Sequence, residues 1–225
     1  MKIKWGALVV DGRGKLGGHV ASQNRGGSYM RTKVTPSNPQ STFQTTVRQL
    51  FGSISSGWSG LTQDVIDAWN AAVDDWKTTN IFGDLKQPSG KALYQRLNQQ
   101  AQLAGYPAVG TPPAKQTLPE SNVTDVTFGI TASAVTATGL YNGTDFTVVT
   151  FSSGPVTIGT NFVKNRMRQI SSSEGAAYSA TDTYTDYVAR FGTPVAGQKV
   201  FFGFKIVADN GQASPMQIVE SVVVA

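Results

Sequence analysis

The spacing of apolar residues changes twice along the chain of 225 residues. Residues 12–39 show no sustained apolar period, residues 40–105 have the spacing of amphipathic helices, and residues 121–225 alternate apolar with polar positions as strands do. This pattern predicts an α+β multidomain protein. Its expected parts are an extended, basic, glycine-rich arm over residues 1–39, a short helical module and an all-β domain.

The first helix is predicted from an apolar stripe that follows Asn38 and Pro39. Asparagine is a favourable N-cap, and proline is common at the first helical position. The stripe consists of Phe43, Val47, Leu50, Phe51 and Ile54. The glycines at 57 and 60 are expected to end this helix.

Two further helices complete the three-helix module of residues 40–105. Thr62 can cap the second helix, and the apolar face of that helix contains Ile66, Trp69, Val73 and Trp76. Ser89 begins the third helix and Gly105 ends it, with apolar positions at Leu93, Tyr94, Leu97, Ala101 and Ala104. Such a small core lies near the lower size limit for independent stability, so we expect it to be stabilised by packing against a neighbouring domain or subunit.

The C-terminal part is predicted to be all β. Residues 106–120 contain four prolines, which indicates a semi-rigid linker. The candidate strands are 123–130, 133–140, 145–152, 161–170, 183–191, 198–208 and 216–224. Asp209, Asn210 and Gly211 give the clearest hairpin signal, between the last two strands. This series fits an immunoglobulin-like or fibronectin type III-like β-sandwich over residues 121–225.

The net charge of +5 is concentrated near the N-terminus. Up to Gln63, eight Lys and Arg residues are accompanied by Asp11 as the one acidic residue. A basic extended segment can lie across a neighbouring subunit and pair with its carboxylates, or contact a nucleic-acid backbone without sequence specificity. We favour the subunit, because Tyr29 is the one aromatic residue between the basic positions of residues 12–39, and a single aromatic side chain gives little base stacking. Nucleic acid stays the alternative partner.

Three features resemble reactive sites, and each has a simpler explanation. Residues 12–17 have the glycine spacing of a dinucleotide-binding fingerprint, but no helix is predicted there and no acidic residue occurs between Asp11 and Asp64. His19 is the only histidine, and it lies in a polar segment that suits a surface position. Asp182 and Asp186 could share one strand face, but we do not favour calcium binding there. We expect no enzymatic activity, cofactor, metal or small-molecule substrate.

The composition excludes further classes of protein. Cysteine is absent, which rules out disulfides, zinc–thiolate centres and a cysteine nucleophile. The first ten residues lack the cleavage pattern of a signal peptide. No apolar stretch approaches the roughly 18 to 20 residues that cross a bilayer. We therefore expect a soluble chain without a membrane partner.

Several short runs in residues 12–105 together resemble a pattern found in structural proteins of tailed bacteriophages and prophages. The runs are Gly14-Lys-Leu-Gly17-Gly18, Arg25-Gly-Gly-Ser-Tyr29-Met-Arg31, Pro36-Ser-Asn38-Pro39-Gln-Ser-Thr42-x-Gln44-x-x-x-Arg48-x-x-Phe51, Trp58-x-x-Leu61 and Ala68-Trp69. The part after the proline-rich linker is similar to the immunoglobulin-like domains often appended to virion proteins. The resemblance implies a virion component, such as a capsid decoration protein, head fibre, portal-vertex protein or tail-associated protein.

The implied partners are other virion proteins and further copies of this chain in a homo-oligomer. Attachment is expected to run through the arm and the helices, with residues 121–225 facing outward. The residues expected to contact other subunits are Arg13, Lys15, Arg25, Tyr29, Arg31, Lys33, Asn38, Pro39, Gln44, Arg48, Phe51 and Trp58.

Overall fold

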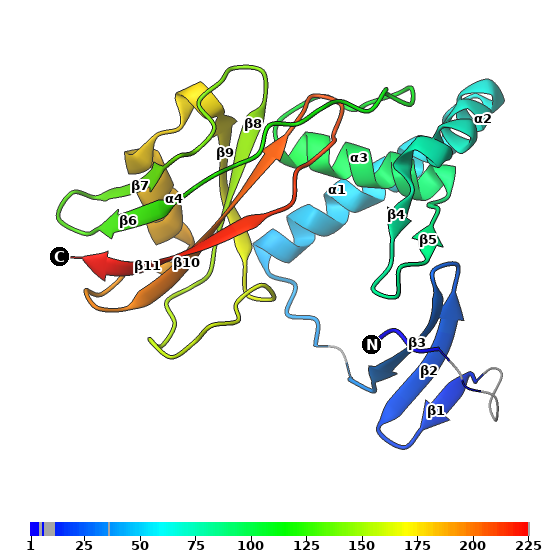
Figure 1. Cartoon of the computed structure of the whole chain (residues 1–225), viewed down its shortest axis with the longest axis horizontal. Coiled ribbons are helices and arrows are strands. Elements are labelled where there is room, and N and C mark those ends of the chain that lie inside the picture. The colour runs from blue at the N-terminus through cyan, green and yellow to red at the C-terminus, as the bar shows by residue number, and fades with distance from the viewer. Residues whose placement is uncertain (5, 7–11, 36, 225) are drawn as a thin grey trace. The chain divides into compact units, whose positions relative to one another are not determined.

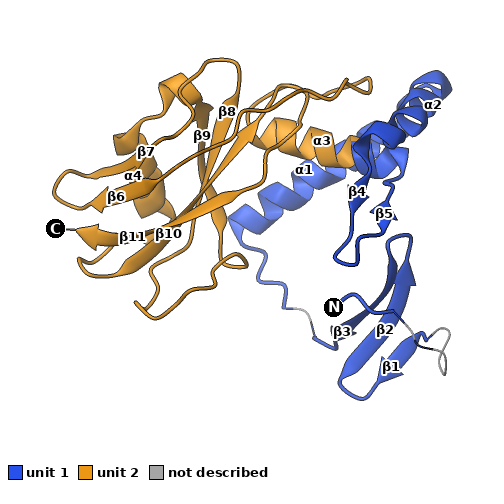
Figure 2. Cartoon of the chain, viewed as in Figure 1, with its two compact units in different colours: residues 1–93 blue, residues 94–225 orange. Residues whose placement is uncertain are grey.

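The computed structural model describes residues 1–4, 6, 12–35 and 37–224, and it contains both α-helices and β-sheets (Figure 1). The α+β class is therefore confirmed. The described residues form two compact units, residues 1–93 and residues 94–225 (Figure 2). We call them the N-terminal and the C-terminal unit. The boundary falls inside helix α3 (Gly90–Leu103) and not at the proline-rich segment that was expected to separate the domains.

The N-terminal unit begins with a three-stranded antiparallel meander. Its strands are β1 (Gly14–Leu16), β2 (His19–Asn24) and β3 (Gly27–Thr32), in the order β1-β2-β3. The first residues of the chain lie along the other edge of β3, where the amide N–H of Met30 donates to the carbonyl of Met1 at 2.8 Å. The meander therefore has its β3 edge partly covered by the same chain.

Residues 14–32 of the expected extended arm form this meander, which was not predicted. Leu16 pairs with His19 and Asn24 pairs with Gly27, so each connection is a turn of two residues. Glycine favours such turns because it adopts backbone angles that other residues avoid. The glycine-rich composition was interpreted as typical of an extended arm, whereas Gly17-Gly18 and Arg25-Gly26 form hairpin turns between strands with few apolar residues.

Helix α1 (Thr42–Ser59) begins three residues later than predicted. Its N-cap is Ser41, whose hydroxyl accepts the amide N–H of Gln44 at 3.4 Å. Asn38 instead accepts a hydrogen bond from the guanidinium of Arg48 at 2.6 Å. The helix continues through position 57, and Gly60 provides its C-cap. The expected apolar stripe is present, but only Ile54 of the helix is buried.

The second and third helices agree with the sequence prediction. Helix α2 (Gln63–Ala71) follows Thr62 and continues as the 3-10 helix η1 (Ala72–Trp76). Helix α3 follows Ser89 and ends at Leu103, and Gly105 beyond it has the positive φ of +92° expected of a stop. Between η1 and α3 lies a short hairpin that was not predicted, formed by β4 (Thr78–Thr79) and β5 (Leu85–Lys86).

The C-terminal unit contains a six-stranded sheet with the order β7-β6-β11-β10-β8-β9. Its strands are β6 (Asp125–Gly129), β7 (Ala134–Thr138), β8 (Thr147–Ser152), β9 (Arg168–Glu174), β10 (Lys199–Val207) and β11 (Gln217–Val224). Neighbouring strands are antiparallel, except that β11 and β6 are parallel. The predicted hairpin at Gly211 joins β10 and β11 as expected.

An immunoglobulin-like sandwich is not confirmed, because the six strands belong to one sheet and a helix covers it. Helix α4 (Ala180–Phe191) contacts both edge strands, β7 and β9, so the sheet curls around it (Figure 1). The strand predicted at 183–191 is thus wrong. Tyr184, Tyr187 and Phe191 follow helical spacing, and Ser179 caps the helix by accepting the amide N–H of Asp182.

The main core lies between the sheet and α4. The ring of Phe128 stands edge-on to those of Tyr187 at 4.8 Å and Phe202 at 5.4 Å. All three side chains are fully buried, and each contributes on the order of 2 kcal/mol by leaving water. Their burial explains why β10 is apolar at almost every position, since its opposite face is covered as well.

The opposite face of the sheet is covered by the end of α3. Ala104 packs against Val149 of β8 and Val207 of β10. Residues 106–120 also belong to this unit, because Gln212 in the β10–β11 connection donates to the carbonyl of Gln116 at 2.6 Å. The segment predicted as a linker is therefore hydrogen-bonded to the β domain. The strand predicted at 161–170 begins only at residue 168.

Candidate interaction surfaces of the N-terminal unit

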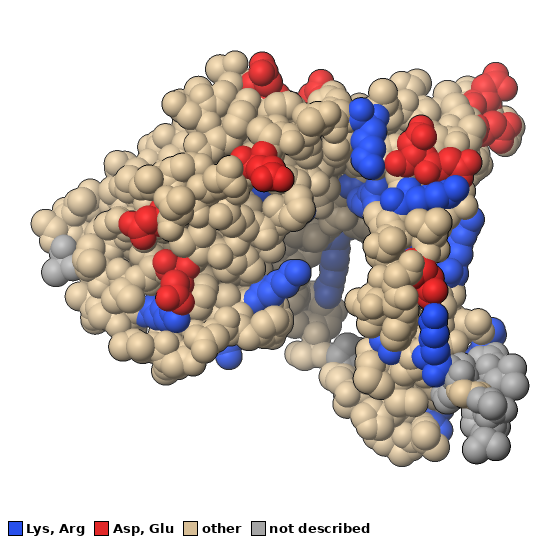
Figure 3. Space-filling view, in the orientation of Figure 1, with Lys and Arg blue, Asp and Glu red and all other residues tan. Residues whose placement is uncertain are grey.

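The N-terminal unit contains a basic pocket of about 650 Å³, lined by the first residues of the chain, the β2–β3 turn and the β4–β5 loop. Among the described residues, its charged lining comprises four cations, Lys2, Lys4, Arg25 and Lys86, with the carboxylate of Asp84. Lys and Arg side chains are visible on the surface of this unit in Figure 3. Residues far apart in the sequence thus place an excess of positive charge around one hollow.

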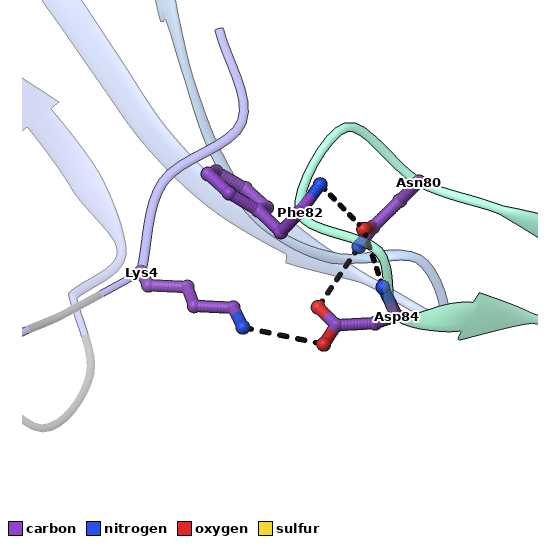
Figure 4. A network of polar contacts seen from close by, with 4 residues as sticks. All are labelled: Lys4, Asn80, Phe82 and Asp84. Carbon is purple, nitrogen blue, oxygen red and sulfur yellow. Dashed lines mark hydrogen bonds and ion pairs between the residues drawn. The ribbon is translucent and has the colours of Figure 1, made fainter.

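A hydrogen-bonded loop forms one wall of the basic pocket (Figure 4). The side-chain oxygen of Asn80 accepts the amide N–H groups of Phe82 at 2.8 Å and Asp84 at 3.0 Å. Its side-chain nitrogen donates to the Oδ2 atom of the Asp84 carboxylate at 3.1 Å. The short side chain of Asn80 therefore fixes the turn between β4 and β5, as asparagine does in Asx turns.

Lys4 links this loop to the start of the chain. Its ammonium group lies 3.2 Å from the carboxylate of Asp84 and 5.4 Å from the centre of the Phe82 ring (Figure 4). The hydrogen bonds from Asn80 and then Lys4 lower the pKa of Asp84. The pair is exposed, so it holds the wall in position without adding much stability.

The opposite wall is the β2–β3 turn at Gly26. The ammonium group of Lys2 donates to the carbonyl of Gly26 at 2.5 Å. A β-carbon on Gly26 would stand 3.0 Å from this ammonium and 3.1 Å from the Cε atom of Lys86. The two lysine side chains therefore converge above the glycine, and a larger residue would displace them.

A second surface is the apolar stripe of α1. Phe43, Val47 and Phe51 are spaced by four residues and lie on one side of the helix. Their exposed fractions are 54%, 46% and 46%. Each large side chain is therefore only half covered by the chain itself, which is unusual for the apolar side of an amphipathic helix.

The structure distributes the predicted contact residues over both surfaces and elsewhere. Arg25 lies in the basic pocket, Phe51 lies in the apolar stripe, and Arg48 is hydrogen-bonded to Asn38. The other positions are on the meander for Arg13, Lys15, Tyr29, Arg31 and Lys33, and before or on α1 for Pro39, Gln44 and Trp58. Pro36 of the phage-like pattern lies outside the described residues.

Most of the basic pocket was not predicted from the sequence. Lys2 and Lys4 were noticed only as part of the N-terminal charge, and Lys86 was not considered. The β4–β5 loop had one local signal, an asparagine at position 80 followed by Gly83 and Asp84. Such a cluster indicates a turn, but it does not show which residues meet there.

The features that resembled reactive sites are also placed by the structure. The glycine run of residues 12–17 leads into β1 and a turn, where the dinucleotide fingerprint needs a helix. His19 is exposed at the start of β2. Asp182 and Asp186 lie one turn apart on α4, not on a strand, and burial followed by the charge of Asp182 raises the pKa of Asp186.

Within the described ranges, no group of three or more acidic or histidine side chains is arranged to hold a metal ion. None of the helices in that part of the chain has the length and apolar composition needed to cross a membrane. Comparison with family models, with curated proteins and with solved structures found no match to this chain.

Proposed function

We propose that this chain is a non-enzymatic structural component of a bacteriophage virion and that its N-terminal unit attaches it to the assembly. The observation that carries the proposal is the half-exposed apolar stripe on α1. The phage-like runs of residues 12–105 support the choice of a virion. They include Phe51, which is one of the three exposed side chains of the stripe.

The stripe has a physical reason to be covered by a partner. Single exposed apolar residues are common, whereas a contiguous row of them marks an interaction surface. Covering the exposed halves of Phe43, Val47 and Phe51 would contribute about 3 kcal/mol in total, at roughly half the value for a fully buried side chain. This corresponds to about a hundredfold in an association constant.

The rest of the N-terminal unit supports the same conclusion. Its described buried apolar residues are Ala21, Ile54, Trp69, Val73, Trp76 and Leu93. Its exposed large apolar residues are Met1, Leu16, Val34, Phe43, Val47, Phe51, Ile81, Phe82 and Leu85. The unit thus keeps more large apolar side chains on its surface than inside, in contrast to the C-terminal unit. A partner that covers part of this surface would supply the packing that the unit lacks.

The test compares Phe51→Asp with Val195→Asp, a charge placed on an exposed apolar residue of the C-terminal unit. Particles assembled with each variant are purified, and the copy number of the protein is measured by quantitative mass spectrometry. We expect Phe51→Asp to lower incorporation by about tenfold or more, because the new carboxylate would be desolvated in the interface. Val195→Asp should incorporate at the level of the unmodified chain.

Two results would contradict the proposal. If the unmodified protein is absent from purified particles, it is not a virion component. If it is present and both variants incorporate equally well, the stripe of α1 is not the attachment surface. Thermal unfolding of each purified variant checks that a loss of incorporation does not come from a loss of folding.

Nucleic-acid binding through the basic N-terminal residues stays the alternative function. The observation that favours it is the cationic lining of the basic pocket. The two functions differ in their response to salt, because nucleic-acid affinity falls log-linearly with salt concentration as counterions are released. Attachment through an apolar stripe should depend only weakly on salt.

A further inference from the structure

The four cations of the basic pocket are not balanced by the acidic group beside them. Lys4 pairs with Asp84, which leaves Lys2, Arg25 and Lys86. Within the described part of the chain, none of these three has a carboxylate partner within ion-pair distance. Like charges held around one hollow repel one another, so an anion that enters it is attracted by all of them.

We propose that the basic pocket binds the oxyanion of a phosphate group, with Lys2, Arg25 and Lys86 as its cationic ligands. Lys2 already donates one hydrogen bond to the carbonyl of Gly26, and an ammonium group has two further N–H donors. Lys86 approaches the same glycine from β5. Arg25 belongs to the turn itself and adds a planar group with several donors.

The walls hold these ligands in position before an anion arrives. The Asn80 hydrogen bonds fix the β4–β5 loop, and the Lys4–Asp84 pair joins that loop to the first residues of the chain. Gly26 leaves space for the lysine side chains to converge. A preorganised arrangement loses less conformational freedom on binding than three independent surface chains would.

The composition of the pocket favours phosphate over carboxylate. Two of the three available cations are lysines, which act as point charges and bind oxygens from any direction, whereas a planar carboxylate is matched best by several bidentate arginines. A phosphate group spreads its charge over oxygens that point in different directions, so it can contact cations from three segments at once. The hollow of about 650 Å³ is also open enough for a phosphate that is attached to a larger molecule.

The proposal goes beyond the attachment function, and it holds whether or not the chain is a virion component. The phosphate can come from free inorganic phosphate or from the backbone of a nucleic acid. Both probes are titrated into the full-length protein in low salt. Inorganic phosphate is followed by amide shifts of Gly26 and Gly27, and a fluorescent oligothymidylate by anisotropy.

Three variants test the site. The double variant Arg25→Gln, Lys86→Gln removes two of the proposed ligands and should weaken binding by at least about tenfold. Gly26→Ala keeps every charge but displaces the lysine ends, and its backbone is not in the left-handed region, so it should fold normally and weaken binding. Lys91→Gln removes a charge from an exposed position of the same unit and should have less than about a twofold effect.

Each outcome decides between the sources or against the site. Saturable amide shifts with phosphate that the double variant abolishes support the proposal, and an oligonucleotide affinity lost in parallel identifies nucleic acid as the source. Phosphate binding without oligonucleotide binding identifies the free anion. Three results would overturn the phosphate site. These are no saturable binding of either probe, a loss of affinity in Lys91→Gln equal to that in the double variant, and binding of polyglutamate alone. Because none of these measurements involves particles, their failure is separate from failure of the proposed function.

Discussion

Tyr187 carries the clearest prediction about stability, because its hydroxyl is buried without a hydrogen-bond partner among the described residues. The ring packs against Phe128 and Phe191 with centroid distances of 4.8 and 5.1 Å. Burial raises the pKa of Tyr187, since the phenolate would be poorly solvated there. Tyr187→Phe keeps the ring contacts and removes the hydroxyl group, which is buried away from water.

We expect Tyr187→Phe to stabilise the C-terminal unit by about 1 kcal/mol, at the low end of the cost of leaving a buried polar group unsatisfied. This corresponds to an increase in melting temperature of about 3 to 6 °C for a unit of this size. Tyr178→Phe is the matched control, because the hydroxyl of Tyr178 donates to the carbonyl of Val135 at 2.7 Å. The same chemical change should lower stability there by about 1 kcal/mol.

The distribution of tryptophan makes the assay specific to one unit. All four tryptophans, at positions 5, 58, 69 and 76, belong to the N-terminal unit in the sequence. Tryptophan fluorescence therefore follows that unit alone, whereas far-UV circular dichroism follows both units, and most of the β-sheet signal comes from the six strands of the C-terminal unit. Tyr187→Phe should raise the temperature of the dichroism transition and Tyr178→Phe should lower it. Neither substitution should change the fluorescence transition. A loss of stability in Tyr187→Phe equal to that in Tyr178→Phe would refute the reasoning.

The pKa shift adds a test in alkaline solution. The ordinary pKa of tyrosine is 10.0, and the value for Tyr187 is raised in the folded chain. Above pH 10 the unfolded chain therefore releases this proton while the folded chain retains it, so the stability contributed by the neutral phenol declines as pH rises. In Tyr187→Phe this decline should be smaller than in the unmodified protein, as measured by urea unfolding between pH 9 and 11.

Two further predictions concern single positions. Gly211→Ala should destabilise the C-terminal unit by more than about 3 kcal/mol, because a β-carbon would stand 2.0 Å from the carbonyl oxygen of Leu97. In the control Gly197→Ala the β-carbon meets no atom, so only backbone strain of about 1 kcal/mol is expected. Urea unfolding measures both free energies. The lowered pKa of Asp84 means that its contacts are present above pH 3.8 and are lost as pH falls through the folded value, so the amide signal of Phe82 should shift there in NMR spectra. Asn80→Ala should reduce that pKa shift, because the hydrogen bond from Asn80 is its largest cause, and an unchanged titration would contradict the assignment.

The sequence predicted the helices of the N-terminal half well because their apolar spacing is regular. The stripe from Phe43 to Ile54 gave α1, and the start of α2 at Thr62 and the stop after α3 at Gly105 were placed correctly. The cap of α1 was placed too early, because Asn38-Pro39 is as good a start signal as Ser41. Local preference could not decide between them.

In the C-terminal half, five of the six strands were predicted from the sequence, whereas β9 was predicted to start too early and α4 was predicted as a strand. Residues 183–191 contain tyrosines, threonines and a valine, which favour strands by propensity. The helix forms because Tyr184, Tyr187, Val188 and Phe191 can face the curled sheet together. This choice is made by tertiary packing, so it is not visible in the local pattern. The same packing turns the expected two-sheet sandwich into one sheet that is covered by a helix.

The basic pocket was beyond sequence prediction for a different reason. Lys4 and Asp84 are separated by 80 positions, and they meet only because residues 1–3 pair with β3 while the β4–β5 loop turns back beside them. Neither event has a strong local signal, since the first strands are poor in apolar residues and the second hairpin has two residues per strand. The charge excess was visible in the sequence, but it was assigned to an extended arm. Because the arm folds into a meander, Lys2, Arg25 and Lys86 lie around Gly26 instead of being spread along an extended segment. The partner proposed for these cations is therefore a single phosphate group and not an extended surface of another subunit.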